Sequence, residues 1–579
     1  MAAAQAPAAA PGAAPGAAPG EDSALSRGRE FVESHALWFL AALLAAELLL
    51  LLEMGRGLTF FYDEWDVVQK DYGGGWHALV APHVGNLIFF PIALYKVLFH
   101  LVGLNHYAVF RLTVIVLHLI SGALIYLMAS RRTSRVNALL AAALILFLGV
   151  AWEDLLWAFQ VGYMLAIAGG LGAWVLIERR DGLGDAAATL CLIVSVGSGS
   201  LGLAVAVGVA VEFAWLRQWR RLWVVVIPVA LYALWYLRYG ESQVTFESLI
   251  HAPGFAADLA AAAVGGLVGR GLEWGRPLAL LAAALLLLRL MRSRSVSARL
   301  AGLIAAAVSL WVLTALARST VSPPETSRYI YLGAVAIVLI GVELLQRTVI
   351  SPRATAFATV LVAYAALTGL STLHSGSLEL RGFSETLTAE LGALELGSAH
   401  APPNYHPDTL RAPTLEAGPY LHTVRAIGST PADDVAQILA SAPSARIAAD
   451  HVLVALYAPR PTPVVGGSAG SALAPAPALV GLGGGTAVKH GRCETIVPGA
   501  GGAATATFVL PRGGVLISDR GAAPAGLAVR RYGEELIGLG ASVPGRRTEE
   551  LSIPKDADAT PWQLQVQSAS PIAVCGVAP

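Results

Sequence analysis

Long apolar runs alternate with short polar loops along the first two thirds of the chain. Each run is about 17 to 22 residues long, which at 1.5 Å per residue matches the roughly 30 Å hydrocarbon core of a bilayer. We therefore predict a helical membrane domain over residues 31–374, with about eleven transmembrane helices. The predicted spans are 36–56, 108–130, 136–156, 159–178, 184–198, 200–216, 222–239, 276–292, 299–317, 329–346 and 353–372.

Two further apolar stretches do not fit this pattern of simple crossings. Residues 86–102 contain Pro91 and Lys96 within the first external loop, and residues 255–268 form a run of small residues that includes glycine. We expect both to be helices that lie at the outer membrane face or dip into it. The first span, 36–56, is expected to be an uncleaved anchor because no small-residue cleavage site follows it.

The two ends of the chain differ from its apolar middle. Residues 1–30 begin with an Ala/Pro/Gly repeat that cannot bury enough surface to offset its ordering entropy, so we expect a disordered cytoplasmic tail. Residues 375–460 form a mixed helical region, and 461–579 carry short alternating runs bounded by Gly and Pro, which is typical of a small β-sandwich. The expected helices are 384–396 and 432–441, a loop is expected at 401–407, and the expected strands are 505–510, 514–517, 526–531 and 562–568.

The predicted fold class is therefore an α-helical polytopic membrane domain, followed by an extracytoplasmic α/β region that ends in a small β-sandwich. Composition supports this prediction, because 56% of the 579 residues are hydrophobic and only 13% are charged, outside the usual range for a soluble enzyme. The 39 basic and 39 acidic residues balance without a basic block, so nothing suggests a nucleic-acid partner.

The distribution of arginine predicts the orientation in the membrane. Arg-rich loops alternate with loops that are richer in acids and aromatics, and the positive-inside rule places the Arg-rich loops in the cytoplasm. An odd number of crossings then leaves the N-terminus in the cytoplasm and the C-terminal domain outside. The Arg-rich loops carry Arg131, Arg132 and Arg135; Arg179 and Arg180; Arg217, Arg220 and Arg221; Arg289, Arg292, Arg294 and Arg299; and Arg347 and Arg353.

The three cysteines fall in two different settings. Cys191 lies in an apolar span, where it is expected to be a small buried hydrophobe. Cys493 and Cys575 lie in the C-terminal region, which the topology places in an oxidising compartment. We therefore predict a disulfide between them, closing a long loop and tying the last strand to its domain.

The role of the β-sandwich is left open by the sequence. It could be a stabilising cap, or it could be a module that binds a glycan or an acceptor. Trp562, Tyr532 and Arg512 are the candidate sugar-contacting residues for the second interpretation.

Ionisable residues collect in the first external loop. Asp63 and Glu64 follow closely on the first span, and His83 and Asn86 come later in the loop. Acids this close to a bilayer carry a solvation cost that a plain connector has no need to bear. The alternative is a solvated loop rim beside an aromatic interfacial belt.

These loops resemble the GT-C glycosyltransferases. The resemblance rests on the Asp63-Glu64 pair in the first external loop, on the segment 82–86, PHVGN, and on 152–160, WEDLLWAFQ, and it covers the membrane domain. It implies an integral membrane enzyme that uses polyprenyl-phosphate-linked sugars, with an extracytoplasmic domain packed above the membrane domain. It also implies that an acid of the first external loop is the general base or orients the acceptor.

The reaction implied by this resemblance needs a base for the acceptor hydroxyl and donors for the departing phosphate. We predict Asp63 as the base and Glu64 as its alternate or as a partner that orients the acceptor. Adjacent residues on an extended segment point to opposite sides, so only one of the two is expected to face the acceptor.

For the donor phosphate we predict Arg328 with Tyr329, at the outer end of the tenth span, and then His83. A guanidinium presents a planar fork of donors that suits phosphate oxygens. The alternatives are a snorkelling arginine and a packing histidine. The small-residue turn 197–200 could let a lipid phosphate approach the backbone, although a tight helical hairpin needs such residues anyway.

For the acceptor or sugar we predict Glu153, Asp154, Trp157 and Gln160 of the second external turn, together with Asn86. Aromatic faces flanked by acids and amides suit a sugar, which has an apolar C–H face and a hydroxyl rim. The alternative is again an aromatic belt with solvated acids.

No cofactor is certain from the sequence. The sequence leaves open whether Asp63, Asp154 and His83, from separate loops, bind a divalent metal. No two of them show a diagnostic metal-ligand spacing. No nucleotide-binding loop and no zinc-protease helix is present.

The predicted function is transfer of a hexosyl or pentosyl group from a polyprenyl-phosphate donor to a polysaccharide, glycolipid or glycoprotein acceptor of the cell envelope or cell wall. The alternative is a non-catalytic glycan-binding or envelope-assembly protein. A flippase for lipid-linked sugars is less favoured, because the centres of the spans are almost free of the ionisable residues that ion coupling needs.

Overall fold

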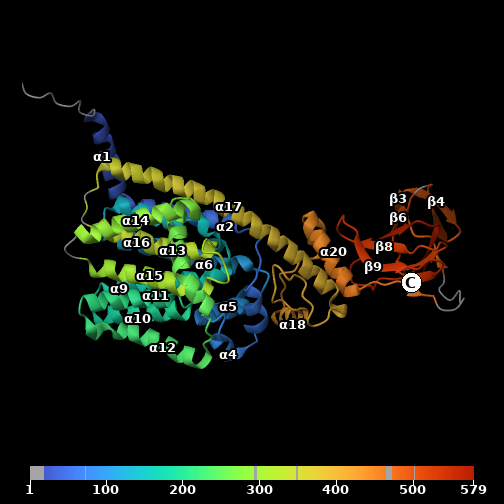
Figure 1. The fold of residues 1–579 in the computed structure, drawn as a ribbon, viewed down its shortest axis with the longest axis horizontal. Helices are drawn as coiled ribbons and strands as arrows, with labels where there is room; N and C mark the ends of the chain where they lie inside the picture. The colour runs from blue at the N-terminus through green and yellow to red at the C-terminus, as the bar shows by residue number, and fades with distance from the viewer. Residues whose placement is uncertain are drawn as a thin grey trace, which may run out of the picture. The chain divides into compact units, whose positions relative to one another are not determined.

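The computed structural model of the protein describes residues 19–71, 73–292, 296–346, 348, 350–464, 473–500 and 502–578. The chain divides into two compact units, and each is described by itself (Figure 1). The helical unit consists of Met1–Met54, Val80–Pro91 and Arg111–Ser377, and the mixed unit consists of Gly55–Leu79, Ile92–Phe110 and Leu378–Pro579.

Long apolar helices form the chain's membrane part, which confirms the predicted fold class of a multi-pass membrane protein. Within the described residues, nine helical segments are long and apolar enough to cross a bilayer. Shorter apolar helices accompany them. The apolar helices are α2 (Ala36–Met54), α5 (Phe89–Val102), α6 (Tyr107–Ser130), α7 (Arg135–Leu146), α9 (Val161–Ile177), α10 (Gly182–Gly197), α11 (Gly202–Trp215), α12 (Trp223–Tyr239), α13 (Phe246–Leu267), α14 (Leu272–Arg292), α15 (Ala298–Arg318), α16 (Ser327–Leu344) and α17 (Pro352–Leu396).

Helix α13 is long and apolar enough to cross, and it contacts both α15 and α16. Near its start, the Ser248 carbonyl accepts a hydrogen bond from Ser319 Oγ, just past the end of α15, at 3.4 Å. Near its other end, Gly266 packs against Ile330 in the first turn of α16. The expected segment 255–268 is therefore part of a longer helix that begins at Phe246, and its place at or in the membrane stays a prediction.

Two elements differ from the sequence-based expectation. Helix α17 continues through the predicted break to Leu396, because no proline interrupts it after Pro352. The predicted third span is broken, since α7 ends at Leu146 and is followed by η2 (Gly149–Ala151) and α8 (Trp152–Leu156). A side chain on Gly149 would collide with the Gly369 carbonyl of α17, so the two backbones meet at this break.

The N-terminal segment also differs from the expectation. Helix α1 (Pro19–Ser34) occupies residues that were expected to belong to a disordered tail. Arg29 Nη1 donates to the Ile350 carbonyl at 2.8 Å, which ties the helix to the start of α17. The rest of the tail, residues 1–18, and the predicted loop arginines Arg294 and Arg347 lie outside the described residues.

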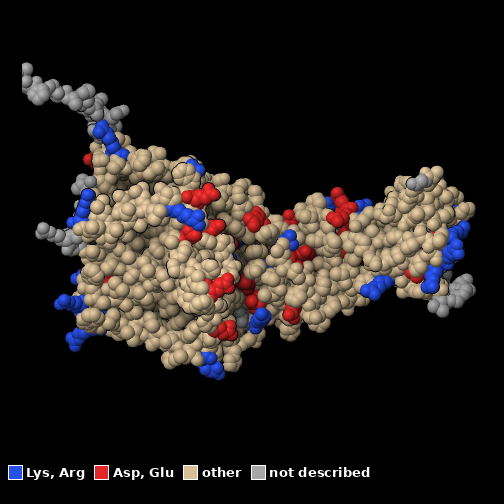
Figure 2. Space-filling view, in the orientation of Figure 1, with Lys and Arg blue, Asp and Glu red and all other residues tan. Residues whose placement is uncertain are grey.

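Many of the Lys and Arg side chains that Figure 2 shows on the helical unit lie at its left end. Two of the arginines in the Arg-rich loops are paired: Arg132 contacts Glu178 and Glu343, both at 2.7 Å, and Arg299 Nε contacts Glu212 at 2.7 Å. Such pairing compensates for the cost of taking the charges out of water. The cytoplasmic location of this end stays a prediction.

One pair of ionisable residues lies inside the spans, whose centres were expected to be almost free of them. Glu47 of α2 and His118 of α6 are both buried, with Glu47 Oε1 and His118 Nε2 3.7 Å apart. Cys191, by contrast, is a free thiol that is only partly buried.

The C-terminal part of the mixed unit is a β-sandwich, as predicted. One sheet has seven strands, in the order β1-β10-β7-β12-β5-β4 with β2 beside β12, and the other has the order β3-β6-β11-β8-β9. Alternate residues of β6, β7 and β8 are buried, as expected for strands with one face on a core. The strands are β1 (Thr462–Pro463), β2 (Leu473–Ala474), β3 (Leu479–Gly483), β4 (Gly485–His490), β5 (Cys493–Pro498), β6 (Ala504–Val509), β7 (Val515–Asp519), β8 (Ala525–Arg530), β9 (Ile537–Val543), β10 (Thr548–Leu551), β11 (Gln563–Ser568) and β12 (Ile572–Val577).

Two of the residues expected to contact a sugar in the sandwich are buried. Tyr532 is 4% exposed and donates to Asp558 at 2.6 Å, and Trp562 is 7% exposed under the Arg531 guanidinium. They pack in the interior instead of presenting a binding surface. Arg512 is exposed.

The predicted disulfide between Cys493 and Cys575 is present and joins the neighbouring strands β5 and β12. It closes a loop of 82 positions. A loop of this length restricts the unfolded chain strongly, so the bond stabilises the sandwich mainly through the unfolded state.

Replacing both cysteines by serine should lower the unfolding free energy of the sandwich by about 2 to 5 kcal/mol. The measurement is denaturant unfolding of the full chain in detergent, with and without a reductant. Reductant should shift the wild-type midpoint and leave that of the double variant unchanged; an equal shift in both would contradict a stabilising role for the bond.

Candidate active site

The buried carboxylate of Glu64 holds the first acidic turn of the mixed unit. The Tyr95 hydroxyl donates to Glu64 Oε1 at 2.6 Å, the Tyr107 hydroxyl donates to Oε2 at 3.0 Å, and the Phe61 N–H donates to Oε2 at 2.9 Å. Glu64 is 0% exposed. With both oxygens occupied by these donors, the carboxylate anchors the turn.

Asp63 occupies a different position on the same turn. It is the N-cap of α3 (Glu64–Asp66), with φ −63° and ψ −17°, so the pair does not lie on an extended segment as expected. Its side chain is half-buried, whereas that of Glu64 is inaccessible. The turn therefore separates the two acids into one that faces the interior and one that reaches the surface of its unit.

The loop around Arg411 is hydrogen-bonded to this turn. The Tyr62 N–H donates to the Arg411 carbonyl at 2.9 Å, and the Phe61 ring stacks on Phe383 at 5.7 Å. Arg411 Nη1 in turn donates to Asp408 at 2.9 Å. Although burial opposes it, the backbone N–H and the guanidinium of Arg411 lower the pKa of Asp408.

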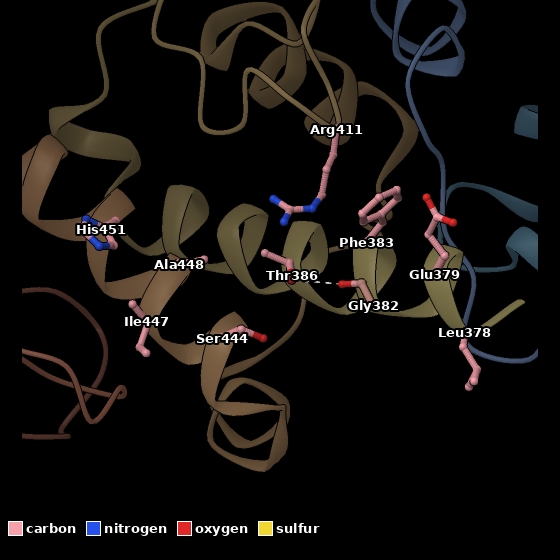
Figure 3. Close-up of a pocket in the computed structure, with 10 residues that line it drawn as sticks. All are labelled: Leu378, Glu379, Gly382, Phe383, Thr386, Arg411, Ser444, Ile447, Ala448 and His451. Carbon is pink, nitrogen blue, oxygen red and sulfur yellow. Dashed lines mark hydrogen bonds between the residues drawn. The ribbon is translucent and has the colours of Figure 1, made fainter. Parts of the chain in front are cut away.

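A groove of about 420 Å³ opens beside the same loop, between the second half of α17 and α20 (Pro443–Tyr457). Figure 3 shows the Arg411 guanidinium reaching into the space between these helices, next to the Phe383 ring. Ser444 and Thr386 add hydroxyl groups from the two helices. The groove is also lined by Leu378, Glu379, Gly382, Ile447, Ala448 and His451.

In the helical unit, Arg328 and Glu153 meet at the start of α16. The Arg328 N–H donates to Glu153 Oε2 at 3.1 Å, and Arg328 Nη1 lies 3.7 Å from Glu153 Oε1. Ser327 Oγ links the two segments, since it accepts from the Glu153 N–H and donates to the Val150 carbonyl. Glu153 thus caps the first turn of α16 and leaves part of the Arg328 side chain, 31%, exposed.

Asp154 is buried beside this pair. It is 0% exposed, and neither carboxylate oxygen has a hydrogen-bond partner among the described residues. A buried carboxylate without donors is costly, so such a group needs a ligand, a proton or a water to complete it. Tyr329, on the other side of Arg328, shares a hydrogen bond of 2.8 Å with Ser322.

The other predicted residues of the second turn are also buried, Trp157 to 4% and Gln160 to 3% exposure. An acceptor could reach them only through a channel into the bundle. Their contact with an acceptor stays a prediction.

His83 and Asn86 form a tight turn. Their backbones exchange hydrogen bonds of 3.0 and 2.9 Å, and Val84 and Gly85 both have positive φ, the geometry of a type I′ turn. Asn86 Oδ1 accepts from Ser200 Oγ at 2.5 Å, which joins this turn to the predicted small-residue turn at 197–200. His83 packs on Phe159, with ring centroids 5.1 Å apart.

Glu153, Asp154, Arg328 and Tyr329 thus lie together in the helical unit. In the same unit, His83 contacts Phe159 and Asn86 contacts Ser200. Asp63 and Glu64 belong to the mixed unit. Sequence reasoning missed the two tyrosines that hold Glu64 and missed Arg411, which had no motif to mark them. Among the described residues, no three His, Cys, Asp or Glu side chains lie together as metal ligands would.

No protein-family model matches the chain, and none of the curated proteins does. Among solved structures, the chain is similar to ArnT from Cupriavidus metallidurans bound to undecaprenyl phosphate, with 15% identity, a TM-score of 0.40, and coverage of 62% of this chain and 80% of that one.

It is also similar to two mycobacterial proteins. These are the arabinosyltransferase EmbB from Mycobacterium smegmatis (14% identity, TM-score 0.32, 93% of this chain and 64% of that one) and the arabinofuranosyltransferase AftD from Mycobacteria (13%, 0.39, 93% and 61%). All three are GT-C glycosyltransferases, the family that the loop motifs resemble.

Replacing Glu64 by leucine should lower the unfolding free energy by about 2 to 4 kcal/mol, because two buried hydroxyls and one N–H lose their acceptor. Glu64→Gln keeps one acceptor oxygen and should cost less. Asp63→Asn should change stability by no more than about 0.5 kcal/mol. Denaturation in detergent, followed by tryptophan fluorescence, measures all three; equal losses for Asp63→Asn and Glu64→Leu would contradict the division of roles.

Proposed function

We propose that this protein transfers a sugar from a polyprenyl-phosphate-linked donor to a hydroxyl of a cell-envelope acceptor, with Asp63 as the general base. The observation that carries the proposal is the acidic turn, in which a fully buried, hydrogen-bonded Glu64 fixes the backbone that presents a half-buried Asp63. A general base must be held within hydrogen-bond distance of the proton that it takes, so the fixed position of Asp63 is the property that matters here.

In the proposed reaction the acceptor oxygen bonds to the anomeric carbon of the donor sugar. The bond from that carbon to the phosphate oxygen breaks, and its electron pair leaves with the polyprenyl phosphate. Asp63 takes the proton of the acceptor hydroxyl. The leaving phosphate is already stable as an anion, so no strong acid is required.

Arg328 is the proposed partner of the donor phosphate. Glu153 caps the helix and orients the guanidinium, while the exposed part of the side chain retains donors for phosphate oxygens. His83 and Tyr329 stay proposed contributors to the same contact. Asp154 is buried and has no hydrogen-bond partner among the described residues, and we propose that it accepts a hydrogen bond from a sugar hydroxyl.

The groove between α17 and α20 is the proposed entry for the acceptor. It shares Arg411 with the turn that carries Asp63, since the Arg411 carbonyl accepts from the Tyr62 N–H. Its mixture of hydroxyl groups, a guanidinium and a carboxylate suits a polyhydroxylated chain.

Purified protein in nanodiscs, offered a panel of radiolabelled polyprenyl-phosphate sugars, should transfer label to an envelope acceptor fraction. Asp63→Asn should lower the rate by about 100-fold or more, as for loss of a general base. Asp66→Asn, on the same turn but paired with Lys70 at 2.8 Å, is the matched control and should keep the wild-type rate.

If the wild type and Asp63→Asn both bind donor but neither transfers sugar from any donor, the enzyme proposal is wrong and the glycan-binding alternative is supported. Arg328→Ala should weaken donor binding, and Arg328→Lys should restore only part of it, because an ammonium cannot form the bidentate contact.

Filling the groove tests the acceptor entry separately. Ser444→Trp should raise the KM for the acceptor by about tenfold without changing the KM for the donor, as expected for lost binding of one substrate alone. Ala455→Trp is the control, because Ala455 is exposed on the same helix and does not line the groove. Equal effects of the two substitutions would count against the groove.

A further inference from the structure

A cavity of about 220 Å³ lies inside the helical unit, between α2, the break after α7, α8 and α17. Its walls are apolar except at one residue, Glu47. An apolar cavity of about 150 Å³ already suffices to bind benzene, so this one is large enough for part of a hydrocarbon chain. The cavity is lined by Glu47, Leu50, Leu146, Phe147, Gly149, Leu155, Ala366, Leu367, Leu370 and Leu373.

The carboxyl group of Glu47 has no hydrogen-bond partner among the described residues, at either oxygen, although the residue is 0% exposed. Polar groups buried in an apolar region are nearly always satisfied, and an ionisable residue inside a membrane span is costly enough to suggest a function. The unsatisfied group lines the cavity, so a ligand in the cavity could satisfy it.

The neighbouring histidine makes its hydrogen bonds to groups other than Glu47. His118 Nδ1 lies 2.7 Å from the Tyr331 hydroxyl, and Nε2 lies 3.1 Å from the Leu146 carbonyl. The carbonyl can only accept, so Nε2 donates to it, and both ring nitrogens are occupied by partners other than Glu47. Glu47 Oε1, at 3.7 Å from Nε2, is beyond hydrogen-bond distance.

The cavity is separated from the surroundings of the bundle by a single helix. Leu367 and Leu370 of α17 line it and are 69% and 39% exposed on the outside of the unit. Glu47 lies seven residues before the end of α2 at Met54, roughly 10 Å along the helix axis. A ligand from the bilayer can therefore reach the carboxyl group with a short polar head while its chain stays among apolar side chains.

We propose that this cavity binds a lipid alcohol, a hydrocarbon or isoprenoid chain that ends in a hydroxyl group, and that Glu47 recognises the hydroxyl. A carboxyl that keeps its proton can donate one hydrogen bond to a hydroxyl and accept another from it. An ammonium would require a desolvated ion pair, and a phosphate would meet a group without a cation to balance it. The proposal does not depend on glycosyl transfer.

Photolabelling of the full chain in nanodiscs tests the site. The probe is dodecanol that carries a diazirine in its chain, and the labelled peptides are identified by mass spectrometry. The label should fall on α2 or α17 beside the cavity. Excess unlabelled dodecanol should reduce this labelling about fivefold more than the same concentration of dodecane or dodecyl phosphate does. A fivefold difference corresponds to about one net hydrogen bond.

Variants separate recognition of the hydroxyl from filling of the cavity. Glu47→Gln, which imitates the protonated carboxyl, should keep labelling within about twofold, whereas Glu47→Leu should lose about fivefold. Ala366→Phe should fill the cavity and abolish the label. Val360→Phe, at a 65% exposed position of the same helix, should not. Thermal unfolding in detergent identifies any variant that fails to fold.

Three results would overturn the proposal. Dodecane could compete as well as dodecanol, Glu47→Leu could be labelled as strongly as the wild type, or the wild type could take no more label at these helices than Ala366→Phe. Preferential competition by dodecanol, lost in Glu47→Leu and kept in Glu47→Gln, would support it.

Discussion

An ionised or polar group among apolar helices is stable only when it finds a partner, and this constraint organises the helical unit. At the Arg-rich end, Arg132 and Arg299 are paired with glutamates from other helices. At the opposite end of α16, Glu153 caps the helix and contacts Arg328. Glu47 and Asp154 are the buried acids whose oxygens lack hydrogen-bond partners among the described residues of these spans. They are accordingly the places where the bundle can take a ligand.

The same constraint explains how two adjacent acids acquire different roles. Glu64 is inaccessible, and its burial is tolerable because two tyrosine hydroxyls and a backbone N–H surround it. Once Glu64 is held, the position of Asp63 follows from the helical turn that begins there. An acid that serves as a structural anchor next to an acid that reaches the surface gives the proposed base, Asp63, a fixed backbone, directly after Tyr62 with its positive φ of 51°.

The mixed unit joins this turn to the rest of the C-terminal half through Arg411. Its carbonyl holds Tyr62, its guanidinium binds Asp408, and the same side chain reaches into the groove beside α20. The β-sandwich contributes differently: its aromatic candidates Tyr532 and Trp562 are interior residues that pack with Arg531. In this unit the groove between α17 and α20 offers polar groups to a ligand.

The sequence by itself determined the fold class, most spans, the four expected strands and the disulfide, because each depends on a local period, a segment length or a compartment. It could not determine that Glu64 is enclosed, since the tyrosines that bind it are 31 and 43 positions away and no local pattern connects them. The break at Gly149 and the cavity at Glu47 were likewise decided by packing between distant segments. Periodicity reports which face of an element is apolar; only the tertiary structure decides which neighbour covers that face, and therefore which polar groups are satisfied and which remain available.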